Sequence, residues 1–453
     1  MTTTTSMARS GYLPNETPPL GRMILLGFQH ILTMFPATIF VAAFTGFHVG
    51  TVLLGSGIST IVALLLSKRG IGKFIPLYYG SSFSYIAAYL GIVQQMTGSL
   101  PTFGQPVPDE VIQTMQAGIV ATGILNIIVG FIIRAVGKAA VDKVLPPVVT
   151  GSVAAIIGFG LAFAALNLAN ANWLVAILTL LLTVLFSVYL RGFAGMLPVL
   201  LGGVAGYILS AILAPGSVNF QPVLDASVFQ VPHVTFPNFA GPMVGTAIVS
   251  IAIMAIATIP ESTAHLYQIS LYVDRFAEET GREKYHLDEN IGFNLILDGV
   301  GDFLHGLVGA TAGTNYGENN SLMAITRNYS GPALLAAGVI AILLAFIGTL
   351  AALVGSVPLA VSGGLAIYLF GVIGMQGIAL MQENKVSMFD ARNLAVGATI
   401  MVVGIGGNIG FEGGFIPITI PVLFPNGLPA IATAAVLGIV LNLVFLIFRP
   451  SET

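Results

Sequence analysis

Two isolated carboxylates lie within apolar stretches of this 453-residue chain and could carry chemistry. Glu261 lies in the run Ile259-Pro-Glu-Ser-Thr-Ala-His265, and Glu318 lies in the polar, glycine-containing run 310–327. A carboxylate in hydrocarbon is costly, so it persists where it faces a protein interior or a water-filled cavity. We therefore expect the two segments to form the two halves of one buried polar site.

The residues beside each acid indicate how the site could hold a small, planar, polar solute. A helix broken near Glu318 would present backbone N–H groups near Phe83 and Gly317, while the carboxylate accepts N–H protons from the solute. Glu261 and His265 are four residues apart on one helix face, so we expect the imidazole to hydrogen-bond this carboxylate. A carboxylate in a low-dielectric site favours its neutral form, which makes Glu261 a candidate for the coupled proton.

Further polar residues are expected to support the site or to act elsewhere. Supporting hydrogen bonds are expected from residues next to the acids and from an adjacent pair in the first apolar run, namely Tyr316, Asn319, Asn320, Gln29 and His30. Asp298 and Asp302 are four residues apart, and we expect interhelical hydrogen bonds from them rather than substrate contacts. We assign no special role to the histidines at span ends or in loops, which are His48, His233, His286 and His305.

Composition places the chain among polytopic membrane proteins. Hydrophobic residues make up 56% of the chain and charged residues 8%, and the mean hydropathy is +0.93, unlike an ordinary soluble domain. The net charge of −3 is close to neutral and gives no indication of a nucleic-acid partner. The first 20 residues are polar and threonine-rich, so we expect a tail rather than a cleavable signal. No metal and no cofactor are expected.

The apolar runs predict an all-α fold with fourteen spans, each about 20 residues long. We expect these spans near 22–45, 49–67, 73–95, 113–135, 145–168, 172–190, 193–214, 241–271, 290–308, 310–327, 331–355, 357–381, 391–409 and 428–448. Glycine and β-favouring residues interrupt the third and tenth spans, so we expect each to break into a short extended segment and a half-helix.

Basic residues and an internal repeat set the expected orientation and symmetry. With a cytoplasmic N-terminus, all 16 Lys and Arg residues fall on or nearest the cytoplasmic side, and both termini lie inside. The segment 145–154 in the fifth span matches 357–366 in the twelfth at proline, valine, glycine and alanine positions. Because an offset of seven spans is odd, the two copies cross in opposite directions, as in the inverted repeats of secondary transporters. The two interrupted spans are also seven apart and indicate a midplane binding site.

Several motifs resemble one transporter family. The run Glu318-Asn-Asn-Ser-Leu-Met-Ala-Ile-Thr-Arg327 resembles the signature of nucleobase–ascorbate transporters, Glu or Gln, Asn, any residue and Gly, then four residues and Thr-Arg. The segments 29–30, 79–83, 261–265, 385–387 and 393–394 resemble those of bacterial uracil:proton symporters in this family.

The resemblance implies a seven-plus-seven inverted repeat with two domains that move relative to each other like an elevator, commonly in a homodimer. A cytoplasmic tail (1–20) would precede a core domain (21–141 and 241–355) and a gate domain (142–240 and 356–453). The expected location is the cell (inner) membrane, where lipid surrounds the spans.

The resemblance also implies roles for individual residues. Glu261 and Glu318 would bind the substrate, backbone amides at Phe83 and Gly317 would contact its carbonyl groups, and His265 would tune the proton site. The sequence differs from the family signature at two positions after Glu318. Ser321 replaces the signature glycine, and Asn320 replaces an apolar residue that is usual in the uracil branch.

Alternative functions stay open at this point. The pair Asn319-Asn320 is more like the purine and xanthine branch, whereas Glu318 and His265 favour uracil. A channel would need repeated polar rings along a pore, and an anion exchanger of the related seven-plus-seven fold would avoid acids at its centre. The sequence therefore favours a nucleobase symporter over these alternatives. The resemblance implies protons as the coupling ion, whereas the residues alone do not distinguish protons from sodium.

Overall fold

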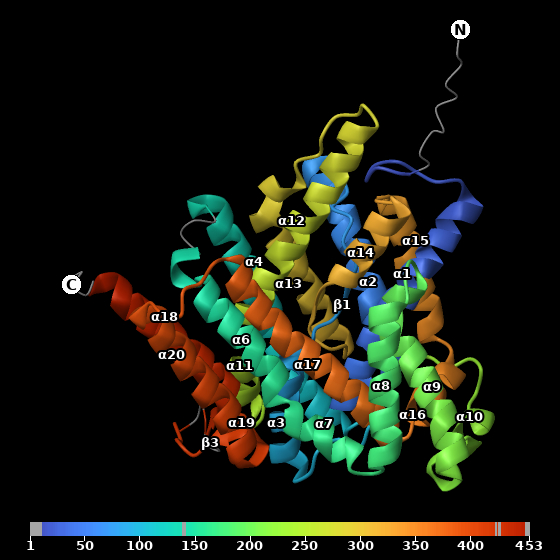
Figure 1. Ribbon diagram of the computed structural model, residues 1–453, viewed down its shortest axis with the longest axis vertical. Coiled ribbons are helices and arrows are strands. Elements are labelled where there is room, and N and C mark those ends of the chain that lie inside the picture. Colours follow the sequence, from blue (N-terminus) through green and yellow to red (C-terminus); the bar gives the residue numbers. More distant parts are fainter. Residues whose placement is uncertain (1–10, 138–141, 422–423, 425–426, 449–453) are drawn as a thin grey trace.

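The computed structural model describes residues 11–137, 142–421, 424 and 427–448, and these residues are mostly helical (Figure 1). Parts of three predicted segments lie outside the described residues: 1–10 of the tail, 138–141 of the first core part, and 422–423, 425–426 and 449–453 of the second gate part.

The first part of the described chain forms a series of helices and one short strand. In order these are α1 (Leu20–Thr45), α2 (Val49–Ile71), β1 (Tyr79–Ser81), α3 (Ile86–Thr97), α4 (Asp109–Val136), α6 (Pro147–Gly160), α7 (Ala162–Ala169), α8 (Trp173–Tyr189), α9 (Pro198–Leu213) and α10 (Gln221–Asp225).

The second part of the described chain consists of further helices and three short strands. It contains α11 (Val244–Ala252), α12 (Ala255–Glu279), α13 (Ile291–Val308), β2 (Gly313–Asn315), α14 (Gly317–Thr326), α15 (Gly331–Ala345), α16 (Gly348–Gly355), α17 (Leu359–Glu383), α18 (Ala391–Met401), α19 (Gly407–Gly410), β3 (Phe415–Ile416), β4 (Leu428–Pro429) and α20 (Ala430–Ile447).

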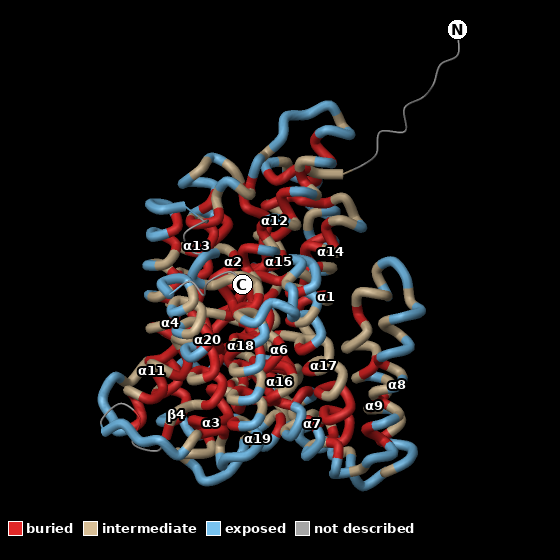
Figure 2. The backbone as a smooth tube through the Cα atoms, turned by 60° about the vertical axis from the view of Figure 1, so that its left-hand side comes forward, coloured by how far each residue is buried: buried red, intermediate tan, exposed pale blue. Residues whose placement is uncertain are grey.

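Many of these helices suit a bilayer in length and composition. Within the described part of the chain, nine helical stretches are long and apolar enough to cross a membrane, and α8, α9 and α15 are shorter apolar helices. Residues of the outer helices, α8 and α9 among them, are largely exposed or half-buried (Figure 2). Many of these residues are apolar, as lipid contact requires, and those of α8 include Leu174, Ile177, Leu181, Leu185 and Val188. These features identify an integral membrane protein, while the count of fourteen spans and the inverted repeat stay predictions.

Two short strands lie inside the stretches where the sequence predicts breaks. β1 pairs antiparallel with β2, and Tyr79 lies opposite Asn315. The ladder is extended at both ends, because Ser82 N donates to Ala312 O at 3.0 Å and Tyr316 N donates to Tyr78 O at 2.9 Å. This pairing satisfies backbone groups that could not find water in a bilayer, and it places the start of α14 next to α12.

The helices pack in two sets. The first set contains α1, α2, α4, α13 and α15, and the second contains α6, α8, α9, α17, α18 and α20. Small residues permit close approach within each set: a Cβ added at Gly123 of α4 would lie 2.6 Å from Gly299 O of α13, and one at Gly158 of α6 would lie 2.4 Å from Phe370 O of α17. The division of the chain into a core and a gate domain stays a prediction. A cavity lies between α12 and α14 on one side and α6 and α17 on the other.

Candidate functional site

A cavity of about 900 Å³ contains five of the predicted site residues, including both isolated carboxylates. Its lining includes Glu261, His265, Gly317, Glu318 and Ser321. Glu318 is exposed to this cavity, and Glu261 is half-buried. Neither carboxylate is sealed inside the protein, so the site is a water-accessible cavity, one of the two surroundings expected for these acids. The carboxylates face a space open to solvent, which removes the cost of a charge in hydrocarbon as effectively as burial in protein does.

Four helices contribute most of the cavity lining. One wall comes from α14 and from a face of α12 that carries Glu261, His265 and Gln268 at helical spacing, and the opposite wall comes from α6 and α17. The sequence analysis missed Gln268 and the residues of the opposite wall, among them Thr150, Gln376, Leu380 and Glu383. Gln376, within the apolar run of α17, was the available sequence signal for this wall. It was not sufficient, because the direction that a side chain faces depends on packing.

The cavity extends toward the side predicted to be cytoplasmic. Its lining reaches Asp142, Glu383 and Asn384, which lie next to Lys143 and Lys385 in the chain. Both lysines belong to the basic clusters that the sequence places inside. With that orientation, the site of Glu261 and Glu318 is open to the cytoplasm.

The imidazole of His265 bonds to Asn315 and not to Glu261. Its Nδ1 lies 2.9 Å from both the backbone O and the Oδ1 of Asn315. Since both partners are acceptors, Nδ1 carries a hydrogen and donates it. The prediction of a hydrogen bond from His265 to Glu261 is therefore wrong. Residues one helical turn apart share a helix face but need not bond to each other, and here strand β2 brings two acceptor oxygens of Asn315 to the ring.

The second ring nitrogen of His265 faces the start of α14. A Cβ added at Gly317 would lie only 2.7 Å from His265 Nε2, so the ring packs directly on this glycine. With Nδ1 occupied by Asn315, Nε2 is the nitrogen that can gain or lose a proton beside Glu318. The close packing of the imidazole explains why position 317 is a glycine, which the sequence did not reveal.

Asn315 organises the polar network behind His265, and the sequence analysis missed its role. Its Nδ2 donates to Ser262 Oγ at 2.7 Å and to Asp298 Oδ1 at 3.2 Å. These two acceptors orient the amide so that Oδ1 points to the imidazole. Ser262 Oγ also accepts from Asn294 Nδ2 at 2.7 Å. The available sequence signal was an asparagine within the interrupted span, which also contains Asn319 and Asn320.

The paired aspartates of α13 bond to other elements, as expected from their position. Asp302 Oδ2 accepts from Asn126 Nδ2 of α4 at 3.0 Å, and its Oδ1 accepts from Gly313 N of β2 at 2.6 Å. The expectation of interhelical hydrogen bonding is therefore confirmed for Asp302. Asp298 acts through Asn315 on the strand that leads into α14.

The residues after β2 fasten α14 to its neighbours. The Tyr316 hydroxyl lies 2.8 Å from Ser81 O and 2.9 Å from Thr38 Oγ1. Asn319 Nδ2 lies 3.0 Å from His30 Nδ1 and so ties α14 to α1. These contacts hold the first turn of α14 against two other elements.

Other predicted residues take different positions. Asn320 Nδ2 donates to His265 O at 3.0 Å and to Gln268 Oε1 at 3.1 Å, so its amide joins α14 to α12. Ser321 lines the cavity, and its hydroxyl donates to Gly317 O at 3.1 Å.

Six predicted residues do not join the cavity lining: Tyr316, Asn319, Asn320 and His30, whose contacts are given above, and Phe83 and Gln29. Phe83 begins a short 3-10 helix, and its ring stacks on Phe40 with centroids 6.3 Å apart. The Oε1 of Gln29 is buried and has no hydrogen-bond partner among the described residues. The structure thus brings together the residues of α12 and α14 and leaves Phe83 and Gln29 at their periphery.

Comparison with known structures supports the fold. The chain superposes on the transmembrane domain of a cyanobacterium bicarbonate transporter, BicA, with a TM-score of 0.61 at 16% identity, covering 87% of this chain and 98% of that one. It also superposes on the murine anion transporter Slc26a9 in the inward-facing state, with a TM-score of 0.63 at 13% identity, covering 96% and 69%. At these identities the likeness concerns the fold alone.

Comparison with known sequences shows the family. A sequence model of the Permease family matches residues 21–413. The chain is 34% identical to the uracil permease of Bacillus subtilis (strain 168) over 445 residues, covering 95% of this chain and 94% of that protein. It is 33% identical to the uracil permease of Escherichia coli (strain K12) over 463 residues, covering 98% and 97%. The chain therefore belongs to the Permease family and is a transmembrane transporter, not an enzyme.

Proposed function

We propose that this transporter imports a nucleobase, with uracil favoured, together with protons. The observation that carries the proposal is the single cavity lined by Glu261, His265 and Glu318 between two sets of helices. Relatives named uracil permease match nearly the whole chain at about 33% identity. A putative pyrimidine permease of Escherichia coli (strain K12) is also 32% identical over 411 residues.

The site offers groups complementary to a pyrimidine ring. Uracil presents N–H donors and carbonyl acceptors in one plane. The Glu318 carboxylate accepts N–H protons with charge assistance, while backbone N–H groups at the start of α14, beginning with Gly317, are available to a carbonyl. Glu261, on the facing turn of α12, can accept a second N–H group. The two acids therefore fix the orientation of the ring.

Proton coupling is assigned to Glu261 and His265. The Nδ1 hydrogen of His265 is held by Asn315, so a transferred proton can reside on Nε2, which faces Gly317. Glu261 lies on the same helix face and lines the same cavity. Protonation of these groups would lower the net negative charge of the site and accompany the neutral substrate.

Transport is proposed to follow an elevator movement of the core segments against the gate segments. The cavity between α12 and α14 on one side and α6 and α17 on the other would be the inward-open state of this cycle. The protein would be a homodimer in the cell (inner) membrane with both termini in the cytoplasm. The backbone amide of Phe83 would contact a carbonyl group of the substrate. The hydrogen bond between Asn319 and His30 would stabilise the start of α14.

Uracil is favoured over a purine because of where Asn320 points. Its Nδ2 is bonded to His265 O and Gln268 Oε1 and is therefore not free to bind a larger ring. Ser321 stays on the cavity surface and is the position through which a purine preference could arise. An anion substrate is disfavoured because two carboxylates would repel it.

Binding of candidate nucleobases to the purified protein tests this proposal. We expect uracil to bind better than xanthine, hypoxanthine, adenine or ascorbate in a titration. We also expect Glu318→Gln to abolish uracil binding, because charge-assisted hydrogen bonds contribute about 1.5–3 kcal/mol each. Glu383→Gln is a matched control, since this carboxylate lies at the mouth of the same cavity. Equal uracil affinity in Glu318→Gln and wild type would overturn the site assignment.

A further inference from the structure

Two histidines and an aspartate from three separate segments meet on the face opposite the cavity mouth. His48 precedes α2, Asp109 is the first residue of α4, and His233 lies in the extended segment before α11. His233 Nε2 lies 3.0 Å from both carboxylate oxygens of Asp109, and His48 Nε2 lies 4.0 Å from Oδ1. The two imidazole rings are 4.5 Å apart between centroids.

These three side chains have the ligand types and spacing of a zinc site. One ligand atom from each lies within 4.8 Å of the others. Tetrahedral zinc with bonds of about 2.0–2.1 Å separates its ligand atoms by about 3.3 Å. The observed separations of 3.0 and 4.0 Å bracket that value, so small side-chain shifts suffice. All three residues are partly or fully exposed, which leaves room for a water as fourth ligand.

We propose that His48, Asp109 and His233 bind Zn²⁺ on the predicted outer face. The backbone around His233 is held in place by hydrogen bonds that do not involve its imidazole nitrogens. Thr51 Oγ1 donates to His233 O at 2.6 Å. Two residues further on, Thr235 exchanges two hydrogen bonds with the Gln116 side chain of α4, at 2.8 and 2.7 Å. The segment that carries His233 is thus already fixed against α2 and α4.

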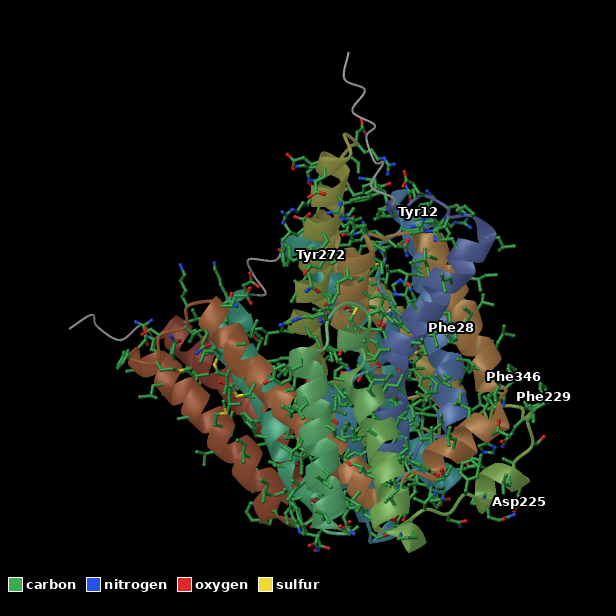
Figure 3. All side chains as sticks on the ribbon, turned by 45° about the vertical axis from the view of Figure 1, so that its right-hand side comes forward. Tyr12, Phe28, Asp225, Phe229, Tyr272 and Phe346 are labelled. Atoms are coloured by element: carbon green, nitrogen blue, oxygen red, sulfur yellow. The ribbon has the colours of Figure 1, made fainter. Side chains whose placement is uncertain are left out.

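Zinc would fasten a connection between the two predicted domains. Residues 226–240 lead from the first gate part into the second core part. The earlier end of this segment is attached to the core by Gln230 N donating to Phe346 O at 2.9 Å. The rings of Phe229 and Phe346 also stack there with centroids 5.7 Å apart (Figure 3). A metal at His233 would add a further attachment, between this segment and the residues that begin α2 and α4.

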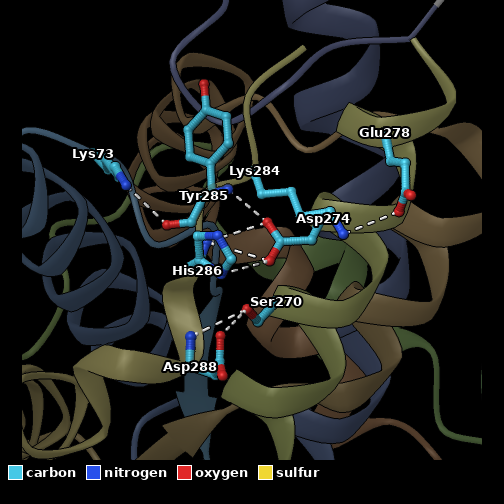
Figure 4. Close-up of polar contacts among 8 residues, drawn as sticks. All are labelled: Lys73, Ser270, Asp274, Glu278, Lys284, Tyr285, His286 and Asp288. Carbon is cyan, nitrogen blue, oxygen red and sulfur yellow. Dashed lines mark hydrogen bonds and ion pairs between the residues drawn. The ribbon is translucent and has the colours of Figure 1, made fainter. Parts of the chain in front are cut away.

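A second group of similar composition lies at the other end of the molecule but has its carboxylates engaged. Asp274 accepts hydrogen bonds from the backbone nitrogens of Tyr285 and His286 at 2.6 and 3.2 Å, and Asp288 Oδ1 accepts from Ser270 Oγ at 2.7 Å (Figure 4). These bonds close the loop between α12 and α13. This group therefore provides an internal control rather than a second zinc site.

Zinc titration of the purified, chelator-treated protein tests the proposal. We expect ZnCl₂ to bind with one equivalent per chain and to raise the temperature of thermal unfolding. His48→Ala and His233→Ala should each weaken zinc binding by more than about tenfold, because a three-ligand site loses a ligand. His286→Ala should behave like wild type. Cobalt(II) in place of zinc should give the visible absorption of a tetrahedral site, which a purely structural role of these histidines would not produce.

The proposal is overturned by any of three results. These are no saturable zinc binding to wild type, unchanged zinc binding in the His48→Ala, His233→Ala double variant, or loss of zinc binding in His286→Ala. Variants that do not fold are replaced by His48→Gln and His233→Gln, whose unfolding temperature without metal is measured first. Uracil binding without zinc should be unchanged in the variants, which separates this proposal from the proposed transport function.

Discussion

Replacing Gly317 by alanine probes the contact between the start of α14 and the imidazole of His265. The added Cβ would lie 2.7 Å from Nε2 and 3.1 Å from Cδ2 of the ring. Non-bonded heavy atoms prefer separations of about 3.5–4.0 Å, so the ring or the helix must move. The ring has little freedom to do so, because Nδ1 is bonded to two oxygens of Asn315 at 2.9 Å.

The size of the effect follows from these two hydrogen bonds. Each contributes about 0.5–1.5 kcal/mol net, so loss of both corresponds to roughly 1–3 kcal/mol. If the ring position is transmitted fully to the site, uracil affinity falls by about 5- to 150-fold. We expect Gly317→Ala to weaken uracil binding within this range.

The assay is a uracil titration of purified variants, with a double-mutant cycle. Gly21→Ala is the matched control, because this glycine lies in the first turn of α1 and its added Cβ would meet no described heavy atom within 4 Å. In a His265→Ala background the clash is absent, so Gly317→Ala should there have little further effect. An equal loss of affinity with and without the imidazole would refute the proposed contact.

Three further substitutions test other parts of the account. Ser321→Gly should change the order of preference among uracil, thymine, xanthine and hypoxanthine in a binding screen, because it removes a hydroxymethyl group from the cavity wall; an unchanged order excludes this position as a determinant of selectivity. Asp302→Ala should lower the free energy of unfolding by about 2–6 kcal/mol, because it leaves Gly313 N and Asn126 Nδ2 without their acceptor; thermal unfolding in detergent measures this, and a change below 1 kcal/mol, about the net value of one hydrogen bond, contradicts it. Glu261→Gln should retain uracil exchange at equal pH but lose proton-driven accumulation, and accumulation at the wild-type level places the coupling site elsewhere.

Two residues of the candidate site could be recognised from the sequence alone. An acid within an apolar run is costly in a membrane and therefore rare, and this pattern is visible from its neighbours in the chain. Glu261 and Glu318 stood out as single acids in apolar surroundings, and both line the cavity. The interrupted stretches likewise stood out by their glycines, and short strands occupy both. The family resemblance, confirmed by the family match over residues 21–413, rested on the same residues.

Partners across the fold could not be predicted in this way. The bond between His265 and Asn315 depends on the register of β1 with β2, which joins segments more than 200 residues apart. Helical spacing predicted Glu261 as the hydrogen-bond partner of His265, because a spacing rule considers only residues on the same helix. Gln376 and Glu383 line the cavity because another face of α17 packs against α6. The sequence of α17 alone does not show which of its faces packs against α6 and which faces the cavity.

The most direct test of proton-coupled nucleobase import is uracil uptake into proteoliposomes that contain only this protein. An inward proton gradient is imposed with no sodium present, and accumulated radiolabelled uracil is measured against liposomes at equal pH. The account predicts accumulation above the external concentration, its collapse on adding a protonophore, and its absence in Glu318→Gln. Uptake that requires sodium, or no uracil uptake while another solute accumulates, would contradict it.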